Sequence, residues 1–264
     1  MPETARKSPA ERSIADALRS CALPLGCPAG FLESPRVSRH QRPGNDHGDI
    51  LTFSRGAVGV VSLPSAEHLE CALDDAAIDE LLEVTRRDVP VGATVEVCGA
   101  AFTIGGDPVT LTMADNRTMQ VSVPPRAALV YDPRAAVLDD LRSEVTPFEW
   151  HAGGGDLEGV RRVGALAGGA LVALATVEQP MGRLARMRVI VSPSSRRRGF
   201  GRVVLDQLAR RVLGEGFLPY GRLAAGDPAA HALATGVGFV DFARSLTLRA
   251  VAGRDYPAVT SINP

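Results

Sequence analysis

The amino-acid sequence predicts a mixed α/β (α+β) fold in which helices pack on a sheet. Two observations support this prediction. Short apolar runs bounded by turn residues, which are typical of strands, recur along the chain. Between them lie longer stretches in which apolar residues return every three or four positions, as on one face of a helix. Strands and helices that alternate in this way favour a layered arrangement.

The first half of the chain contains both kinds of pattern. An amphipathic helix is expected at 10–23, followed by an irregular segment rich in Pro and Gly at 24–48. Two strands around an Arg55-Gly56 turn are expected within 49–63, and a pair of helices within 66–87. We expect strands at 94–104, 109–123 and 128–131, with a Gly105-Gly106 turn between the first two, and a helix at 135–145.

The second half has a clearer pattern. Two strands within 161–177 are joined by Gly168-Gly169, a pair that suits a tight primed hairpin turn. A strand at 184–191 leads into a helix at 199–213, and Gly214 is placed to cap the C-terminus of that helix. The last predicted elements are a strand at 220–225, a helix at 228–236 and a strand at 240–249.

Composition favours a soluble globular protein. Of the 264 residues, 45% are hydrophobic and 22% charged, which allows a sizeable core. No run is long enough to span a membrane, and the N-terminus lacks a secretory pattern. The four cysteines, Cys21, Cys27, Cys71 and Cys98, are not at metal-ligand spacing, so we expect reduced thiols and no metal. Reduced thiols are typical of a cytoplasmic protein, which we expect this to be. Cys71 and Cys98 are expected to be inert thiols in the core.

Positive charge is concentrated in one segment. Between Gly182 and Leu213 there are nine arginines and one acid, Asp206, so the local charge is +8 in a chain whose net charge is -1. Because the whole chain is not basic and aromatic residues are not interleaved with the arginines, we expect no nucleic-acid partner. The arginine-rich segment is interpreted as a local binding site for a polyanion. The alternative is a solvent-exposed loop without a ligand.

The segment 188–202, RVIVSPSSRRRGFGR, places a strand, a short loop and a helix start in succession. Backbone N–H groups at a helix start have no intrahelical acceptor and lie at the positive end of the helix dipole. Gly199 and Gly201 remove side chains where a backbone would approach phosphates. The segment therefore predicts an anion site, with added charge from Arg196, Arg197, Arg198 and Arg202.

This segment resembles the pyrophosphate-binding motif of the GNAT acetyltransferase superfamily, Arg/Gln-x-x-Gly-x-Gly/Ala, and reads Arg196-Arg-Arg-Gly199-Phe-Gly201. Downstream, the stretch from Asp227 to Gly238-Phe239 resembles the family's second motif, in which Asn, then Ala, then Tyr precede Gly-Phe. The resemblance covers about residues 147–250. It implies the GNAT fold, with a mixed, mostly antiparallel sheet flanked by helices.

The resemblance also implies acetyl-CoA as co-substrate, without a metal. In that family the strand before the loop and the next strand splay apart, and the pantetheine arm lies between them. Here, the backbone of 189–191 would contact the pantetheine and the acetyl carbonyl, and amides of 197–202 would hold the pyrophosphate. The coenzyme-binding residues so implied are Val189, Ile190, Val191, Arg196, Arg197, Arg198, Gly199, Phe200, Gly201, Arg202 and Asp227.

Two positions depart from the family pattern. Asp227 stands where the family has Asn, and Ala234 stands where it has the Tyr that often protonates the departing thiolate. We expect Tyr220, His231 or water to supply that proton, unless the domain is catalytically weak. A thiolate needs little acid help, since the pKa of a thiol is about 8.5. The alternatives without a catalytic role are that Tyr220 is a structural residue of a strand and that His231 is an exposed residue of a helix.

The candidate general base is Glu149, in the segment PFEWHAGGGD before the central strands, with Glu178 behind it. Capping or a surface position is the alternative for Glu149 and for His151. Trp150, between them, is expected to pack on the core.

Three segments are expected: an accessory, GNAT-like but degenerate domain at 1–134, a GNAT acetyltransferase domain at 135–252 and a tail at 253–264. The predicted function is direct transfer of an acetyl group from acetyl-CoA to an amine, with backbone amides of 189–191 polarising the thioester carbonyl. The alternatives are a catalytically weak acyl-CoA-binding module for regulation or assembly, and a sensor that binds a small molecule in the first half. The acceptor stays open, no membrane partner is expected, and a homodimer is possible.

Overall fold

The computed structural model describes residues 15–22, 27, 32, 37–41, 49–55, 58–63, 75–87, 89, 92–97, 100–104, 109–114, 118–120, 127–180, 182–224 and 226–250. The chain divides into two compact units. Unit 1 comprises Met1–Ser13, Thr112–Leu223 and Asp227–Asp241, and unit 2 comprises Ile14–Leu111, Ala224–Gly226 and Phe242–Pro264. Within the described ranges, no helix is both long and apolar enough to cross a membrane.

Unit 1 contains a sheet whose strands follow the order β11-β10-β9-β8-β7. Neighbouring strands are antiparallel except β10 and β11, which are parallel. The mixed, mostly antiparallel sheet predicted from the sequence is therefore confirmed. The bounds are β7 (Ala128–Tyr131), β8 (Arg162–Ala167), β9 (Ala170–Val177), β10 (Leu184–Val191) and β11 (Leu218–Ala224), while β6 (Val109–Met113) runs across the division between the units.

Two glycines form the turn of the β8–β9 hairpin. Gly168 and Gly169 have φ values of 62° and 90°, a conformation that L-residues with side chains rarely adopt. A positive φ at both central positions defines a primed turn, whose twist matches that of the two strands. Ala167 pairs with Ala170 across this turn. The predicted turn is confirmed.

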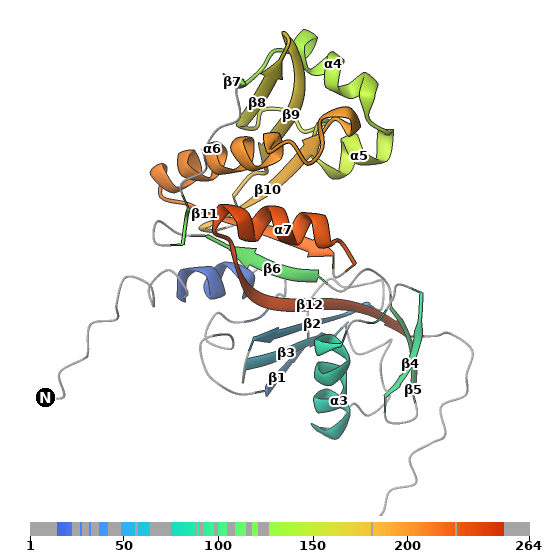
Figure 1. Ribbon diagram of the computed structural model, residues 1–264. Coiled ribbons are helices and arrows are strands. Elements are labelled where there is room, and N and C mark those ends of the chain that lie inside the picture. Colours follow the sequence, from blue (N-terminus) through green and yellow to red (C-terminus); the bar gives the residue numbers. More distant parts are fainter. Residues whose placement is uncertain are drawn as a thin grey trace, which may run out of the picture. The chain divides into compact units, whose positions relative to one another are not determined.

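Helices cover both faces of this sheet (Figure 1). Helix α6 packs on β8, β9 and β10, whereas α4 packs on β9 and α5 on β10. Residues alternate along β10, so that Val189 joins the cluster under α6 and Ile190 joins the cluster under α4. The bounds are α4 (Ala135–Glu144), α5 (Pro147–Ala152), the 3₁₀ helix η2 (Pro193–Ser195), α6 (Phe200–Gly214) and α7 (Pro228–Val237).

The burial of Trp150 agrees with the prediction from sequence, whereas the C-terminal end of α6 does not. Trp150 is buried with Leu141, Leu174 and Ile190, as expected. Gly214, however, is the last residue of α6 and does not cap it. Gly216 takes the left-handed position, with φ of 86°, and the Phe217 N–H donates to the Val212 carbonyl. The helix runs one residue further than predicted, because the chain turns at the second glycine of Gly214-Glu215-Gly216.

In unit 2 the strands follow the order β1-β3-β2-β12, with β5 paired to β12 and β4 paired to β5. Helix α3 packs on β2 and β3, burying Ile78, Leu81 and Leu82. Residues 15–22 are helical. The bounds are β1 (Val37–Gln41), β2 (Asp49–Arg55), β3 (Val58–Leu63), α3 (Asp75–Arg86), β4 (Thr94–Val97), β5 (Ala100–Ile104) and β12 (Val240–Ala250).

Several expectations are corrected or lie outside the described residues. The predicted strand 94–104 is two antiparallel strands, β4 and β5. The strand predicted at 109–123 ends at Met113, and residues 118–120 are not extended in a sheet. The segment 24–48, predicted to be irregular, contains strand β1 at Val37–Gln41. The predictions for residues 10–14, most of the rest of 24–48, 66–74, Gly105-Gly106, Cys71, Cys98 and the tail 253–264 lie outside the described residues.

The division into units differs from the boundaries predicted at 134 and 252. Residues 112–134 group with unit 1, and residues 242–250 group with unit 2. Strand pairing explains the second difference, because β12 is antiparallel to β2 from Arg244↔Ser54 to Arg249↔Asp49. Its hydrogen-bonding partner lies far earlier in the chain, where no local pattern reveals it.

Candidate active site

Strands β10 and β11 diverge. Their parallel register covers three pairs, from Leu184↔Leu218 to Arg186↔Tyr220, although β10 continues to Val191 and β11 to Ala224. On its other edge β10 stays paired with β9 as far as Val191↔Ala173. Within the described part of the chain, residues 187–191 therefore have one strand edge without a β partner. Backbone N–H and C=O groups on such an edge need partners, which a ligand can supply.

The turn after β10 is shaped to present amide groups. Residues 196–202, called the 196–202 turn below, connect η2 to the first turn of α6. Arg197 and Gly199 have left-handed φ values of 60° and 87°. No side chain caps α6, and its first turn contains no acidic residue. The N–H groups of the first helical turn thus keep their capacity for an external anion, at the positive end of the helix.

Gly201 brings this helix start against the end of β10. It is buried, and a Cβ atom at this position would lie 3.0 Å from a methyl carbon of Val191 and 3.6 Å from Leu233. The glycine permits close packing of α6 on the strand. Consequently, the uncapped helix start and the unpaired strand edge adjoin one another.

The arginines divide into two groups. Six of the nine are bonded to protein groups: Arg183, Arg186, Arg188, Arg196, Arg210 and Arg211. The other three, Arg197, Arg198 and Arg202, are exposed and form no ion pair within the described ranges. Arg198 lies over the Phe200 ring at 5.5 Å. The uncompensated positive charge therefore lies on the 196–202 turn itself.

Arg196, predicted as a coenzyme contact, is bonded to protein in a different way from its neighbours. Its Nη2 donates to Glu149 Oε1 at 2.5 Å, and its Nε donates to the Val191 carbonyl at 3.2 Å. The guanidinium therefore joins α5 to the end of β10.

Glu149 caps a helix. Its Oε2 accepts from the backbone N–H and from the hydroxyl of Thr146, both at 3.0 Å, while the Glu149 N–H donates to Thr146 Oγ1. These hydrogen bonds, first from the Thr146 backbone and then from Arg196, lower the pKa of Glu149 to about 2. The capping alternative is confirmed. A carboxylate this weakly basic does not suit the role of general base predicted for it.

The pH dependence of stability tests this assignment. Because the folded-state pKa of Glu149 is depressed, its contribution is present above the unfolded value of about 4.3 and is lost as pH falls toward 2. We expect Glu149→Gln to lower the free energy of unfolding by about 0.5–1 kcal/mol at pH 7, since the pair is partly exposed. Urea denaturation from pH 7 to pH 3 should show this difference shrinking below pH 4.5; a difference that is constant with pH would contradict the assignment.

Four polar side chains, those of Glu178, Arg186, Arg188 and Tyr220, lie near the point where β10 and β11 part. Glu178 Oε1 is 3.3 Å from Arg186 Nη1 and also accepts from Arg188 Nε. Tyr220 is opposite Arg186 in the parallel register and is half-buried. Burial lowers the pKa of Arg186, and the Glu178 carboxylate partly offsets this effect. Glu178 is thus held in ion pairs with two guanidinium groups, and Tyr220 supplies a hydroxyl group at this point.

The stretch from Asp227 to Phe239, which resembles the second GNAT motif, lies on and around α7. Asp227 caps α7 by accepting from the Ala230 N–H at 2.9 Å. His231 is half-buried on α7 and donates its backbone N–H to the Asp227 carbonyl. Ala234 is buried and carries no acidic group. A contact of Asp227 with pantetheine and a catalytic role for His231 stay predictions.

Sequence reasoning missed the capping residue Thr146, although the signal is present in Thr146-Pro-Phe-Glu149, the pattern of a capping box. It also missed Glu144, which accepts from the hydroxyl groups of Ser192 and Ser194. No local pattern links those residues, since they lie on α4 and at the end of β10.

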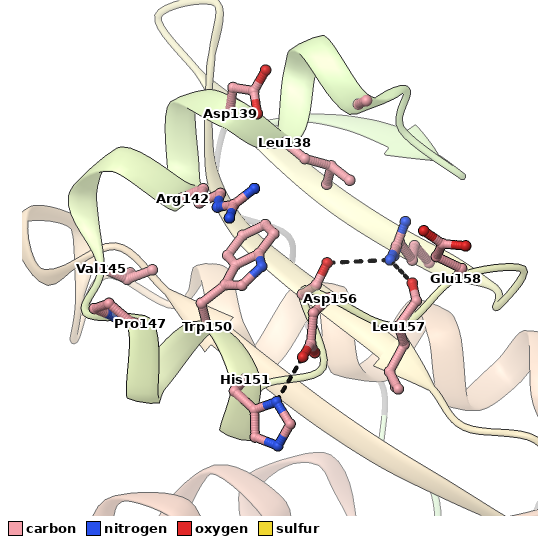
Figure 2. Close-up of a pocket in the computed structure, with 13 residues that line it drawn as sticks. Leu138, Asp139, Arg142, Val145, Pro147, Trp150, His151, Asp156, Leu157 and Glu158 are labelled. Carbon is pink, nitrogen blue, oxygen red and sulfur yellow. Dashed lines mark hydrogen bonds and ion pairs between the residues drawn. The ribbon is translucent and has the colours of Figure 1, made fainter.

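A separate cavity of about 590 Å³ lies beside α4 and α5 (Figure 2). In it Arg142 lies over the Trp150 ring at 5.9 Å, and His151 Nδ1 is 2.6 Å from Asp156 Oδ2. None of its lining residues belongs to the 196–202 turn or to β10; they are Ala135, Leu138, Asp139, Arg142, Val145, Pro147, Trp150, His151, Gly155, Asp156, Leu157, Glu158 and Arg162.

No protein-family model and no curated protein matches this chain. Similar solved structures include an acetyltransferase from the GNAT family of Colwellia psychrerythraea (17% identity, TM-score 0.45, 58% of each chain covered). A GCN5-related N-acetyltransferase from Kribbella flavida has 17% identity and a TM-score of 0.43 over 58% of this chain and 61% of its own. The ribosomal-protein-S18-alanine N-acetyltransferase from Escherichia coli has 16% identity and a TM-score of 0.35 over 48% of this chain and 98% of its own.

The matched part is less than two thirds of the first two of these chains. In unit 1 the element order, the divergence of β10 from β11 and the uncapped helix start after β10 follow the GNAT arrangement predicted from the sequence. Unit 1 has a mixed, mostly antiparallel sheet flanked by helices, as the resemblance to the GNAT superfamily implies.

Proposed function

We propose that this protein is an acetyl-CoA-dependent N-acetyltransferase, with its coenzyme site in unit 1. One observation carries the proposal: the uncapped start of α6 adjoins a strand edge without a partner. The first feature suits a diphosphate and the second suits an extended chain of amide groups. Coenzyme A contains both, joined in that order.

The dimensions support this pairing. From Met187 to Val191 the unpaired edge of β10 comprises five residues, which at about 3.3 Å per residue is about 17 Å. A pantetheine arm extended along it from the 196–202 turn would bring its thioester close to the point where the strands part. Backbone groups of Val189 and Val191 then face the arm, since those of Ile190 face β9, and an amide among them would polarise the acetyl carbonyl.

The reaction follows from these positions. The neutral amine attacks the acetyl carbon, its lone pair forms the new C–N bond, and the tetrahedral intermediate collapses with cleavage of the C–S bond. We assign Tyr220 as the acid that protonates the departing thiolate, because it lies opposite Arg186 where the strands part. Since Glu149 and Glu178 are held in ion pairs, the amine proton passes to solvent water.

This assignment predicts a pH profile. Without an enzymic base, kcat/KM should rise with pH until the acceptor amine is itself deprotonated, near pH 8 for an α-amino group and above pH 10 for a lysine. The measurement is a pH–rate profile with two acceptors of different pKa. A plateau at the same pH for both acceptors would show a base on the enzyme.

The decisive experiment measures free thiol release from acetyl-CoA with a panel of small amines, amino acids and peptides, together with the mass of each acceptor. Binding with turnover supports the enzyme. The alternative, an acyl-CoA-binding module for regulation or assembly, is favoured by Ala234 at the family's Tyr position. Binding without turnover on any acceptor would support that alternative, and absence of binding would exclude both.

Unit 2 remains the proposed accessory partner, with GNAT-like ancestry as a prediction. A cytoplasmic location and a homodimer also stay predictions, checked by fractionation and by light scattering.

A further inference from the structure

Arg196 is the only residue of the motif Arg196-Arg-Arg-Gly199-Phe-Gly201 whose side chain forms an ion pair within the described residues. Its Nη2 contacts the Glu149 carboxylate at 2.5 Å and its Nε contacts the Val191 carbonyl at 3.2 Å. Two guanidinium nitrogens, Nη2 and Nε, thus donate to protein acceptors, and Glu149 compensates the charge. Arg196 is exposed like Arg197 and Arg198, but it differs from them in forming this ion pair.

Glu149 is fixed as firmly on its own side. One carboxylate oxygen accepts from Arg196 and the other accepts twice from Thr146, the N-cap of α5. A shift of the 196–202 turn relative to α5 would break a charge-assisted hydrogen bond. Both carboxylate oxygens of Glu149 already accept hydrogen bonds, so neither is available to form a replacement contact if the turn moves.

The preceding helix makes a second contact with the same region. Glu144, the last residue of α4, accepts from the hydroxyl groups of Ser192 and Ser194, and those two hydroxyls are 2.8 Å apart. Ser192 is fully buried directly after β10. Two carboxylates from the α4–α5 segment therefore hold the chain on either side of η2, just before the amides that start α6.

We propose that Glu149 and Arg196 are positioning residues that clamp the 196–202 turn to α5, and that Arg196 is not itself a phosphate ligand. The inference rests on the proposed function and deepens it. The diphosphate is then bound by backbone amides and by the free side chains of Arg197, Arg198 and Arg202. Arg196 contributes by fixing where those amides point.

Two variants separate a clamp from a direct ligand. Glu149→Gln keeps the capping box, because Gln also serves at that position, but removes the charge that holds Arg196. If the pair is a clamp, Glu149→Gln and Arg196→Gln each weaken coenzyme A binding by about threefold to tenfold. The double variant should be no weaker than either single one. If Arg196 is a ligand, Glu149→Gln releases it and binding is unchanged or tighter, which overturns the proposal.

Matched variants complete the calorimetric series on the full chain. Glu158→Gln removes an exposed carboxylate that forms no ion pair within the described part of the chain, and it should leave the Kd unchanged. Arg197→Gln removes a free charge. Its effect should add to that of Glu149→Gln, since the two act separately.

A measurement without ligand keeps this inference distinct from the proposed function. Amide hydrogen exchange at 197–202 should be about threefold to tenfold faster in Glu149→Gln than in the wild type or in Glu158→Gln. Exchange at the C-terminal end of α6 should not change. If the wild type fails to bind coenzyme A but this local difference is found, the clamp stands and the proposed function falls. Unchanged exchange at 197–202 would overturn the clamp.

Discussion

Gly201→Glu should abolish coenzyme A binding. The variant places a carboxylate at the first turn of α6, beside the amides that we propose hold the diphosphate, and an anion there competes for the same donors and repels phosphate. The space is tight as well, since a Cβ would lie 3.0 Å from a methyl carbon of Val191, a contact that a small shift of the Val191 side chain relieves. Isothermal titration calorimetry with coenzyme A should show no heat beyond dilution, against saturable binding by the wild type.

Two control variants separate the charge from the fold. Gly201→Ala adds only the Cβ and should retain binding, in keeping with the Gly/Ala alternative in the motif. Gly214→Glu adds the same charge at the far end of α6, where nothing lies within 4 Å of a Cβ, and should bind normally. Circular dichroism melts establish that each variant is folded. Full affinity in a folded Gly201→Glu protein would remove the basis for placing phosphates at this turn.

Tyr220→Phe should reduce kcat by on the order of 100-fold while leaving the KM for acetyl-CoA within about twofold. The phenol is assigned to the departing thiolate only, so its loss affects the transition state and not coenzyme binding. The effect is at the low end for a general acid, because a thiolate leaves readily.

Tyr131→Phe is the matched control, since Tyr131 is 53% exposed on β7 and bonds to Gln207 at 3.4 Å. It should have wild-type kcat. His231→Gln tests the other predicted donor. A large fall in that variant with normal Tyr220→Phe kinetics would transfer the acid role to α7.

Local chemistry explains why so much of unit 1 could be predicted. The strand predicted at 184–191 coincides with β10, and the helix predicted at 199–213 is within one residue of α6 at both ends. Each depends on signals within a few residues: alternating apolar positions, a proline after the strand, and Gly199 with its positive φ before the helix. The Gly168-Gly169 turn is equally local.

Long-range pairing explains the rest. Glu149 was predicted as a base because a carboxylate precedes the central strands, but its chemistry is set by Arg196, which lies far along the chain. The same holds for β12, whose partner β2 begins at Asp49. Sequence patterns locate charged groups, and the fold decides which of those charges remain uncompensated.

Amide chemical-shift mapping of the isotope-labelled full chain, titrated with coenzyme A, tests the central claim most directly. The largest shifts should fall on the N–H groups of residues 197–202, followed by those of 187–191 along the edge where β10 has left β11. Gly201→Glu should show neither set of shifts. Saturable binding whose shifts lie elsewhere, for example around the cavity beside Trp150, with 197–202 unchanged, would contradict the account.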